Sequence, residues 1–570
     1  MEQEKKICQN CKKDFVIEPD DFAFYEKMKV PAPTWCPECR FARRFSWRNE
    51  RSFWRRSCGL CGKQTIAIYS DPLPVYCREC WWDDDWDSIQ YGQEYNFSKP
   101  FFTQFSELLN RVPKVNFFGQ NNVNCDYATN VWDCKNCYLC TSTLKSEDIS
   151  YSRGVDASYW CADCLHITSG NQAYECIDSD NINSSSFLID SANCVNCHFL
   201  FDCNNCSDCF MSANLRNKRF VFRNIQYAEA DYKRLMAEEG MSKYSSSEKL
   251  LEEFELLKKK SIHKYAKIIK SIGCTGNSIS NSHNVKESYY ISSEAEDSKY
   301  CYRGHHFKDI YDENFVVEAE LAYETANVGF GVARTKFSLN LSYSINEVSY
   351  CESCYTSSYL FGCVGLRNKQ YCIFNKQYTK EEYEELVHKI IQHMNDMPFV
   401  DKKGRVYKYG EFFPTELSTF AYNETLAQEY FPLSKEEALA KGYNWKESDT
   451  KNYIATMSAN DLPDDIKNVA DSVINEVISC AHKDKECQEM CTTAFKIIPQ
   501  ELALYRKMGL PLPRLCPNCR HFSRLKKTNP LKLWHRKCMK PGCQNEFETS
   551  YAPDRPEIVY CEQCYQQEVI

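Results

Sequence analysis

The stretch Lys27–Arg40 reads KMKVPAPTWCPECR, and the stretch Lys507–Arg520 reads KMGLPLPRLCPNCR. The two match at eight of fourteen positions, and each contains a Cys-Pro-x-Cys pair. Twenty-four residues separate that pair from Cys11 in the first copy and from Cys491 in the second. The chain therefore carries a duplicated domain, with one copy near each end.

Each copy holds eight cysteines in four pairs. A short spacer lets both thiolates of a pair reach one zinc ion, so each copy fits two tetrahedral sites. We expect about four structural zinc ions, with sequential ligation favoured over an interleaved cross-brace that has the same ligands. The predicted ligands are Cys8, Cys11, Cys36, Cys39, Cys58, Cys61, Cys77, Cys80, Cys487, Cys491, Cys516, Cys519, Cys538, Cys543, Cys561 and Cys564.

Disulfides are the main alternative for so many cysteines. The first ten residues, MEQEKKICQN, do not resemble a signal peptide, and no apolar run reaches the ~18 to 20 residues of a membrane span. We therefore expect a cytoplasmic protein without a membrane partner, in a compartment that keeps its thiols reduced and available to metal.

The run from Cys8 to Arg44, with Phe15, Phe24-Tyr25, Pro33 and Cys-Pro-Glu-Cys-Arg at 36–40, resembles the treble-clef zinc-ribbon domain of many bacterial proteins. That resemblance implies a helix from Arg40 to Phe45. The second copy departs from it, because three residues separate Cys487 from Cys491 instead of two. Zinc modules at both ends of a Cys- and Tyr-rich repeat also resemble uncharacterised proteins of small-genome bacteria, which bring no established activity.

A basic and aromatic segment joins the two sites of each module. Between Arg40 and Arg56 the chain reads RFARRFSWRNERSFWRR, and the second copy has no acidic residue from Arg520 to Asn545. Arginines fork onto phosphates, and exposed aromatic rings stack on bases. The predicted nucleic-acid contacts are Arg40, Arg43, Arg44, Arg48, Arg51, Arg55, Arg56, Trp47, Trp54, Arg520, Arg524, Lys526 and Lys527.

That pattern has a second interpretation, in which the aromatic residues form a small core and the arginines bind acidic protein. The acidic segment Asp83–Asp87 lies close enough in sequence to neutralise the first patch. The alternatives are a nucleic acid, either RNA or DNA, and an acidic protein surface, including this chain's own.

A second duplication lies between the modules: Leu215–Tyr232 matches Leu366–Tyr383 at eight of eighteen positions. Each copy ends a series of short strand-like pieces separated by Asn, Asp and Ser. Repetition without intervening helices favours a parallel β-solenoid, with a β-sandwich as the alternative. The fold class is mixed and mainly β, with two treble-clef zinc modules flanking a duplicated β-repeat region and connecting helices.

Many cysteines fall in the first array. Free cysteine behaves as a small apolar residue, so we expect these side chains inside the coils. The knuckle-like spacing from Cys194 to Cys209 leaves metal binding open as the alternative. The cysteines are Cys125, Cys134, Cys137, Cys140, Cys161, Cys164, Cys176, Cys194, Cys197, Cys203, Cys206 and Cys209.

The predicted organisation follows from these repeats. It begins with a double zinc module over 1–82, a linker over 83–120, a first β-repeat array over 121–227 and a helical connector over 228–276, which has an apolar stripe from Leu250 to Ile272. A second β-repeat array over 277–378 and a helix over 379–397 follow. The chain then continues with an ordered strap and helix over 398–480, whose helix is at Asp464–Cys480, and with a second double zinc module over 481–570.

Catalytic motifs are missing from the sequence: it has no phosphate-binding glycine loop, no Gly-x-Ser-x-Gly elbow and no His-Glu-x-x-His helix. We expect a non-enzymatic, zinc-stabilised scaffold that binds nucleic acid through its zinc modules. The nucleic acid is RNA, with ribosomal RNA as one candidate, or DNA. We expect no small-molecule substrate. The alternative is a protein-interaction scaffold with structural zinc and no nucleic-acid ligand.

Overall fold

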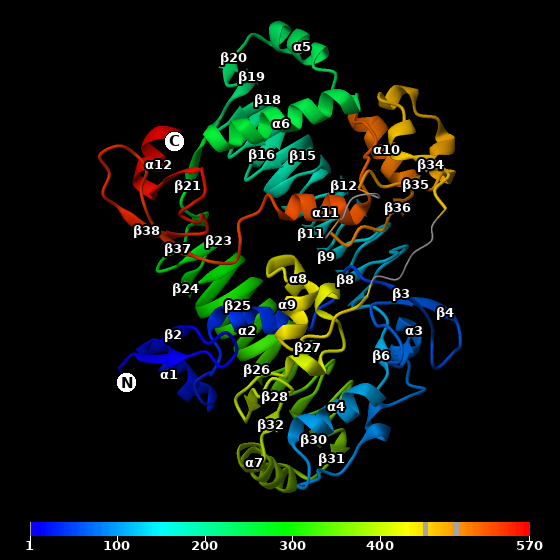
Figure 1. Cartoon of the computed structure of the whole chain (residues 1–570), viewed down its shortest axis with the longest axis vertical. Helices are drawn as coiled ribbons and strands as arrows, with labels where there is room; N and C mark the ends of the chain where they lie inside the picture. Colours follow the sequence, from blue (N-terminus) through cyan, green and yellow to red (C-terminus); the bar gives the residue numbers. More distant parts are fainter. Residues whose placement is uncertain (1, 448–453, 483–486, 488) are drawn as a thin grey trace.

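The computed structural model describes residues 2–447, 454–482, 487 and 489–570. The chain is mixed α/β with more strand than helix, and two large, mainly parallel sheets of fourteen and ten strands dominate it. Figure 1 shows these sheets as two arrays that follow one another along the long axis, with the termini on the same side. This confirms the expectation of a mixed, mainly β chain.

The first array winds forward by twelve residues at a time. Arg153 pairs in parallel with Leu165, and Leu165 pairs with Ile177. The strands are β7 (Gly119–Gln120), β8 (Thr129–Trp132), β9 (Thr141–Leu144), β10 (Glu147–Ser150), β11 (Arg153–Asp156), β12 (Tyr159–Ala162), β13 (Leu165–Thr168), β14 (Asn171–Tyr174), β15 (Ile177–Ile189), β16 (Ala192–Val195), β17 (His198–Phe201), β18 (Asn204–Ala213), β19 (Arg219–Phe222) and β20 (Ile225–Gln226).

From Ala128 to Ser212, every third residue of this array is buried. Cys161, Cys164 and Ile167 form one such series, each at most 1% exposed. The residue before many inward positions has a positive φ, for example Asp163 at 54°. Asn and Asp tolerate this left-handed conformation better than most residues. The same period of three explains the Cys-x-x-Cys spacing that had left metal binding open.

The second array has the same construction, with offsets of eleven to thirteen residues. Gly276 pairs with Ser288, whereas Val332 pairs with Ile345. Its strands are β22 (Ile268–Ile269), β23 (Gly276–Ser280), β24 (His283–Lys286), β25 (Ser288–Val328), β26 (Val332–Lys336), β27 (Leu339–Leu341), β28 (Ile345–Ser349), β29 (Ser358–Phe361), β30 (Gln370–Ile373) and β31 (Lys376–Gln377).

The duplicated Leu-Arg-Asn-Lys segment ends each array. In both copies the last parallel strand turns back as an antiparallel hairpin, β19 with β20 and β30 with β31. A helix follows in each case, α5 (Glu229–Glu238) or α7 (Lys380–Asp396). A hairpin and a helix protect the open end of a parallel sheet from pairing with another chain.

Two predicted helices differ from the structure. The connector helix α6 (Tyr244–Lys260) packs Leu250 and Phe254 on the first array as expected, but it ends before Tyr265. Residues beyond it form β21 (Ile262–Lys264), which pairs in parallel with β39 (Ile558–Tyr560). Strand β39 supplies hydrogen-bond partners for the backbone of this segment. Its isoleucines also favour an extended conformation over a helix.

The helix predicted at Asp464–Cys480 is wrong. That segment forms 3-10 turns at Ile466–Asn468 and Asp471–Asn475, followed by β35 (Ile478–Ser479). Its apolar residues suit a helical period, but Ile478 pairs with Phe495 of the second module. The strap elements are β32 (Phe399–Val400), β33 (Val406–Tyr407), α8 (Leu426–Tyr430), α9 (Lys435–Ala440) and β34 (Met457–Ser458).

The zinc modules make up most of the remaining structure, and the predicted linker contains the buried helix α4 (Phe101–Arg111) with β6 (Lys114–Val115). The module elements are β1 (Glu4–Ile7), β2 (Asp14–Ile17), α1 (Pro19–Met28), α2 (Pro37–Phe45), β3 (Trp54–Ser57), β4 (Gln64–Ala67), β5 (Val75–Tyr76) and α3 (Arg78–Trp82), then β36 (Ala494–Phe495), α10 (Pro499–Met508), α11 (Pro517–Leu525), β37 (Trp534–Lys537), β38 (Glu546–Thr549) and α12 (Glu562–Val569).

The packing around Cys164 predicts how substitutions at this position affect stability. Ser152 occupies the same inward column one coil earlier, and its hydroxyl donates to the carbonyl of Ser150 as the Cys164 thiol donates to that of Ala162. Cys164→Ser should therefore change the free energy of unfolding by less than about 1 kcal/mol. Cys164→Leu should destabilise by about 1–3 kcal/mol through overpacking. Urea unfolding checks both, and equal effects of the two substitutions would contradict this packing.

Candidate metal centres and the cleft between the arrays

Four groups of four cysteines gather near the two ends of the chain. Within each group the four sulfur atoms lie within 4.8 Å of one another. The pairs combine sequentially and not as an interleaved cross-brace. The groups are Cys8, Cys11, Cys36 and Cys39; Cys58, Cys61, Cys77 and Cys80; Cys480, Cys491, Cys516 and Cys519; and Cys538, Cys543, Cys561 and Cys564.

The spacing of these sulfurs fits zinc. Zinc bonded to thiolates at about 2.3 Å places the sulfurs of a tetrahedron about 3.8 Å apart. The Cys11 and Cys36 sulfurs are 3.7 Å apart, and those of Cys61 and Cys77 are 3.9 Å apart. Each group supplies four protein ligands, which is the composition of a structural site.

A tight turn and the start of a helix build each site. Cys36 is the N-cap of α2, and its backbone N–H donates to the Cys8 sulfur at 3.2 Å. Cys516 caps α11, and its N–H donates to the Cys480 sulfur at the same distance. Helix N-termini favour thiolates. At Cys58, burial opposes ionisation, but backbone hydrogen bonds from the same site lower its pKa to about 6.

One ligand differs from the predicted set. Cys487 was expected to pair with Cys491, but Cys480 completes that four-sulfur group. Cys480 follows strand β35 and accepts the hydrogen bond that Cys8 accepts in the first copy, so it is the structural counterpart of Cys8. The irregular spacing between Cys487 and Cys491 was the sequence signal for this difference.

Helix α2 presses its arginines into the second array. Arg44 Nη1 lies 3.0 Å from Asp312 Oδ1 and 3.4 Å from Glu324 Oε2. Arg40 Nη2 lies 2.8 Å from Asp312 Oδ2, and Arg43 Nη2 lies 2.7 Å from Glu324 Oε1. Asp312 and Glu324 are twelve residues apart, a spacing of one coil. Two stacked carboxylates thus receive three guanidinium groups.

Burial and charge oppose one another in this network. Burial alone would lower the pKa of Arg43, but Glu324 and Glu411 raise it above its ordinary value. Burial raises the pKa of Glu324, although Arg43 and Arg44 oppose that rise. Removing one partner would leave a buried charge without compensation, which destabilises a folded protein strongly.

Helix α11 repeats the arrangement on the first array. Arg524 Nη1 lies 2.7 Å from Asp163 Oδ1 and 2.8 Å from Glu175 Oε1, and Arg520 Nη1 lies 2.7 Å from Asp163 Oδ2. These two carboxylates are again twelve residues apart. The N-terminal module therefore binds the second array and the C-terminal module binds the first, as Figure 1 shows for α2 beside β25 and α11 beside β11. We call these two contacts the arginine clamps.

A further buried network joins the clamps. Arg153 Nε lies 2.9 Å from Glu50 Oε2, and Arg153 Nη1 lies 2.6 Å from Glu429 Oε2. His521 of α11 contacts the same Glu429 oxygen at 3.0 Å. Burial, reinforced by the charge of Arg51, lowers the pKa of His521 to about 3, so the ring is neutral.

Burial overturns most of the predicted nucleic-acid contacts. The acidic partners of Arg40, Arg43, Arg44 and Arg524 come from residues far away in the sequence, so the basic pattern alone did not reveal that these charges are neutralised internally. Trp47 packs in the core, where its ring centroid lies 5.2 Å from that of Phe413. The buried members are Arg40, Arg43, Arg44, Arg48, Arg51, Trp47, Arg520 and Arg524, while Trp54, Arg55, Arg56, Lys526 and Lys527 are exposed or partly exposed.

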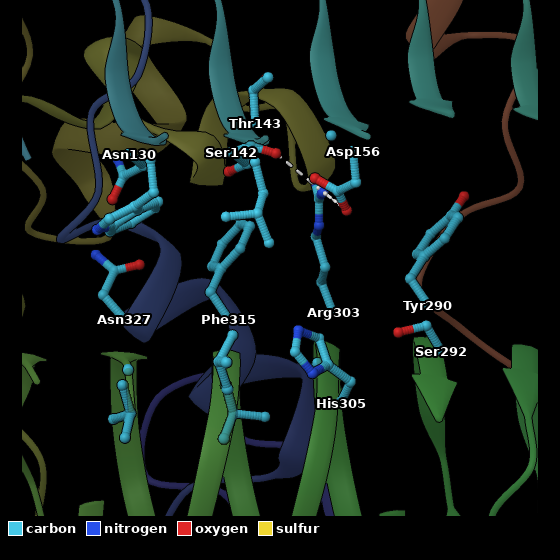
Figure 2. Close-up of a pocket in the computed structure, with 18 of the residues that line it drawn as sticks. Asn130, Ser142, Thr143, Asp156, Tyr290, Ser292, Arg303, His305, Phe315 and Asn327 are labelled. Atoms are coloured by element: carbon cyan, nitrogen blue, oxygen red, sulfur yellow. Dashed lines mark hydrogen bonds and ion pairs between the residues drawn. The ribbon is translucent and has the colours of Figure 1, made fainter. Parts of the chain in front are cut away.

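A cleft of about 320 Å³ lies between the two arrays. Figure 2 shows Arg303 reaching from the second array toward Asp156 of the first. Arg303 Nη2 donates to the carbonyl of Ser142 at 3.0 Å and lies 3.7 Å from Asp156 Oδ2. Gly154 admits this side chain, because a Cβ there would lie 2.2 Å from Arg303 Nη1.

The polar end of the cleft contains two atoms without partners. His166 is 9% exposed, and its Nδ1 lies 2.9 Å from Asp178 Oδ1. Burial lowers the pKa of His166, so we assign a neutral ring whose Nδ1–H donates to Asp178 and whose Nε2 accepts. Within the described residues, His166 Nε2 and Arg303 Nη1 have no hydrogen-bond partner. Four aromatic residues also line the cleft: Trp132, Phe315, Phe330 and Tyr343.

The sequence did not single out His166 or Arg303, because no local pattern distinguishes them. His166 and Asp178 are twelve residues apart and therefore meet only once the coil has formed. No helix in the described part of the chain is long and apolar enough to cross a membrane.

Known proteins add little to this description. No protein family matches the sequence, and no curated protein matches it. Among solved structures, one match is a protein of Desulfovibrio desulfuricans G20 whose provisional assignment is an acetyltransferase. It is 8% identical, covers 51% of this chain and 86% of its own, and has a TM-score of 0.09. At that TM-score the match carries no argument about fold or activity.

The clamps predict an effect of Arg44→Met. The substitution leaves Asp312 and Glu324 buried with one cation fewer, so the free energy of unfolding should fall by about 3–5 kcal/mol. Arg524→Met should act in the same way on the first array. Urea unfolding measures both.

Arg55→Met is the matched control, because Arg55 is exposed in the same module. It should leave stability unchanged. Zinc content, measured by elemental analysis, should remain that of the wild type in all three variants. An Arg44→Met protein as stable as Arg55→Met would refute the clamp.

Proposed function

We propose that this protein is a non-enzymatic, zinc-stabilised scaffold that binds a small molecule in the cleft between its two arrays. The ligand class is a molecule with a hydrogen-bonding head and an apolar or aromatic body. The observation that carries this proposal is the pair of partnerless polar atoms, His166 Nε2 and Arg303 Nη1, in a cleft that several aromatic side chains also line.

The zinc modules support this role from a distance. Zinc holds the first turn of α2 and of α11 against the rest of its module, and those helices carry the arginine clamps. We further propose that the modules are treble-clef zinc ribbons and that the arrays are parallel β-solenoids. The hairpin-and-helix construction of the sites supports the first assignment, and the twelve-residue parallel offset supports the second. A reduced, cytoplasmic setting belongs to the same proposal.

The shape and chemistry of the cleft define what it would accept. Its volume is at the lower end of the range typical of small-molecule sites, which are mostly apolar with a few placed polar groups. Arg303 offers a donor and His166 an acceptor, so a head group with both functions fits. Trp132 and Tyr343 provide flat surfaces for the body of the ligand.

Nucleic-acid binding is the second candidate. Arg55 is exposed on strand β3 next to the half-exposed Trp54, and Lys526 is exposed at the end of α11. These residues remain available for phosphate contacts and stacking, although Lys526 is paired with Glu489. An acidic protein partner would use the same residues.

Native mass spectrometry of the zinc-loaded protein, isolated from its own cells at low salt, tests the proposal. Half of the sample is treated with nuclease. A bound small molecule that survives this treatment should appear as an added mass on the wild type. That mass should be lost from His166→Phe and from Arg303→Met, because each removes one partnerless polar atom.

His535→Phe is the matched control. This histidine is exposed in the C-terminal module and lies outside the cleft, so the added mass should persist. A wild-type protein that carries no added mass would sink the cleft proposal. Recovery of nuclease-sensitive RNA or DNA, weakened by Arg55→Ala and by raised salt, would transfer the assignment to the second candidate.

A further inference from the structure

Three residues between Cys480 and Cys491 belong to a further group of side chains that could hold a metal ion. His482, Cys487 and Glu489 form a second group with Cys519, and one donor atom of each lies within 4.8 Å of the others. Cys519 is also a member of the neighbouring four-cysteine group. Two groups of possible metal ligands therefore share the Cys519 thiolate.

The distances in this second group resemble the edges of a coordination tetrahedron. The Cys487 sulfur lies 3.7 Å from the Cys519 sulfur and 3.8 Å from both His482 Nδ1 and Glu489 Oε2. His482 Nδ1 and Glu489 Oε2 are 3.7 Å apart. Edges of about 3.3–3.8 Å are expected for zinc with nitrogen, oxygen and sulfur ligands at about 2.0–2.3 Å.

Charge balance also permits a second ion. One zinc ion with four thiolates carries a charge of about −2, from a divalent cation and four monoanions. A second divalent ion brings with it the Cys487 thiolate and the Glu489 carboxylate, and neutral His482 adds nothing. The total charge of the site is therefore unchanged, although the number of ions doubles. Lys526, which pairs with Glu489, lies at the exposed rim.

We propose that the C-terminal module holds a pair of zinc ions at this point, bridged by the Cys519 thiolate. Cys480, Cys491 and Cys516 are the other three ligands of the first ion. His482, Cys487 and Glu489 are the other three ligands of the second ion. Within the described part of the chain, none of the other three cysteine groups shares a ligand with such a second group. The chain then binds five zinc ions, two in the N-terminal module and three in the C-terminal one.

Zinc counting tests the pair directly. The wild-type protein should bind five ions per chain by native mass spectrometry with elemental analysis as a check. Cys487→Ser and His482→Ala should each bind four, because only the second ion loses a ligand. Cys274→Ser is the matched control, since this partly buried thiol lies in the second array, and it should keep five.

Cadmium substitution tests the bridge. Replacing zinc by cadmium-113 should give two cadmium resonances that are coupled to each other through the Cys519 sulfur, and Cys487→Ser should abolish the coupling. A wild-type count of four ions would overturn the proposal, and so would five ions without cadmium–cadmium coupling. A Cys480→Ser protein that still binds as many zinc ions as the wild type would show that Cys487 can replace Cys480 as a ligand of a single ion. That result would also overturn the proposal of two ions.

Discussion

Stacked carboxylates neutralised by helix-borne arginines hold this molecule together. Asp312 with Glu324, and Asp163 with Glu175, are each separated by one coil of an array, and each pair is buried under a helix of a zinc module. Neither side is stable alone in that environment, because a buried charge needs a compensating partner. Each array and its module therefore depend on each other.

The clamps cross, and this arrangement gives the cleft its position. The N-terminal module binds the second array and the C-terminal module binds the first, so both ends of the chain hold the arrays together. Arg303 completes the contact by entering the space above Gly154. The four-cysteine groups come earlier in this chain of dependence, since Cys36 and Cys516 are members of such groups and begin the helices that carry the arginines.

Much of this organisation could be predicted from local patterns. The duplicated knuckles predicted the four-cysteine groups, and the repeated Leu-Arg-Asn-Lys segment precedes the hairpin that follows the last parallel strand of each array. Cysteine content predicted a small-residue core, although its three-residue period was not recognised. Predictions failed where a partner was remote: the connector helix ends at Lys260 because β21 pairs with β39, and Cys480 replaces Cys487 because strand β35 places it there.

The sequence by itself determined the cysteine pairs, the duplication and the strand-rich repeats, because each depends on residues close together or evenly spaced along the chain. Only the tertiary structure decided what the arginines do. A cationic, aromatic segment has the same composition whether it meets phosphate or buried carboxylates. The choice rests on which residues lie opposite it, and Arg44 meets Asp312 from 268 residues away. Sequence neighbours carry no record of that contact.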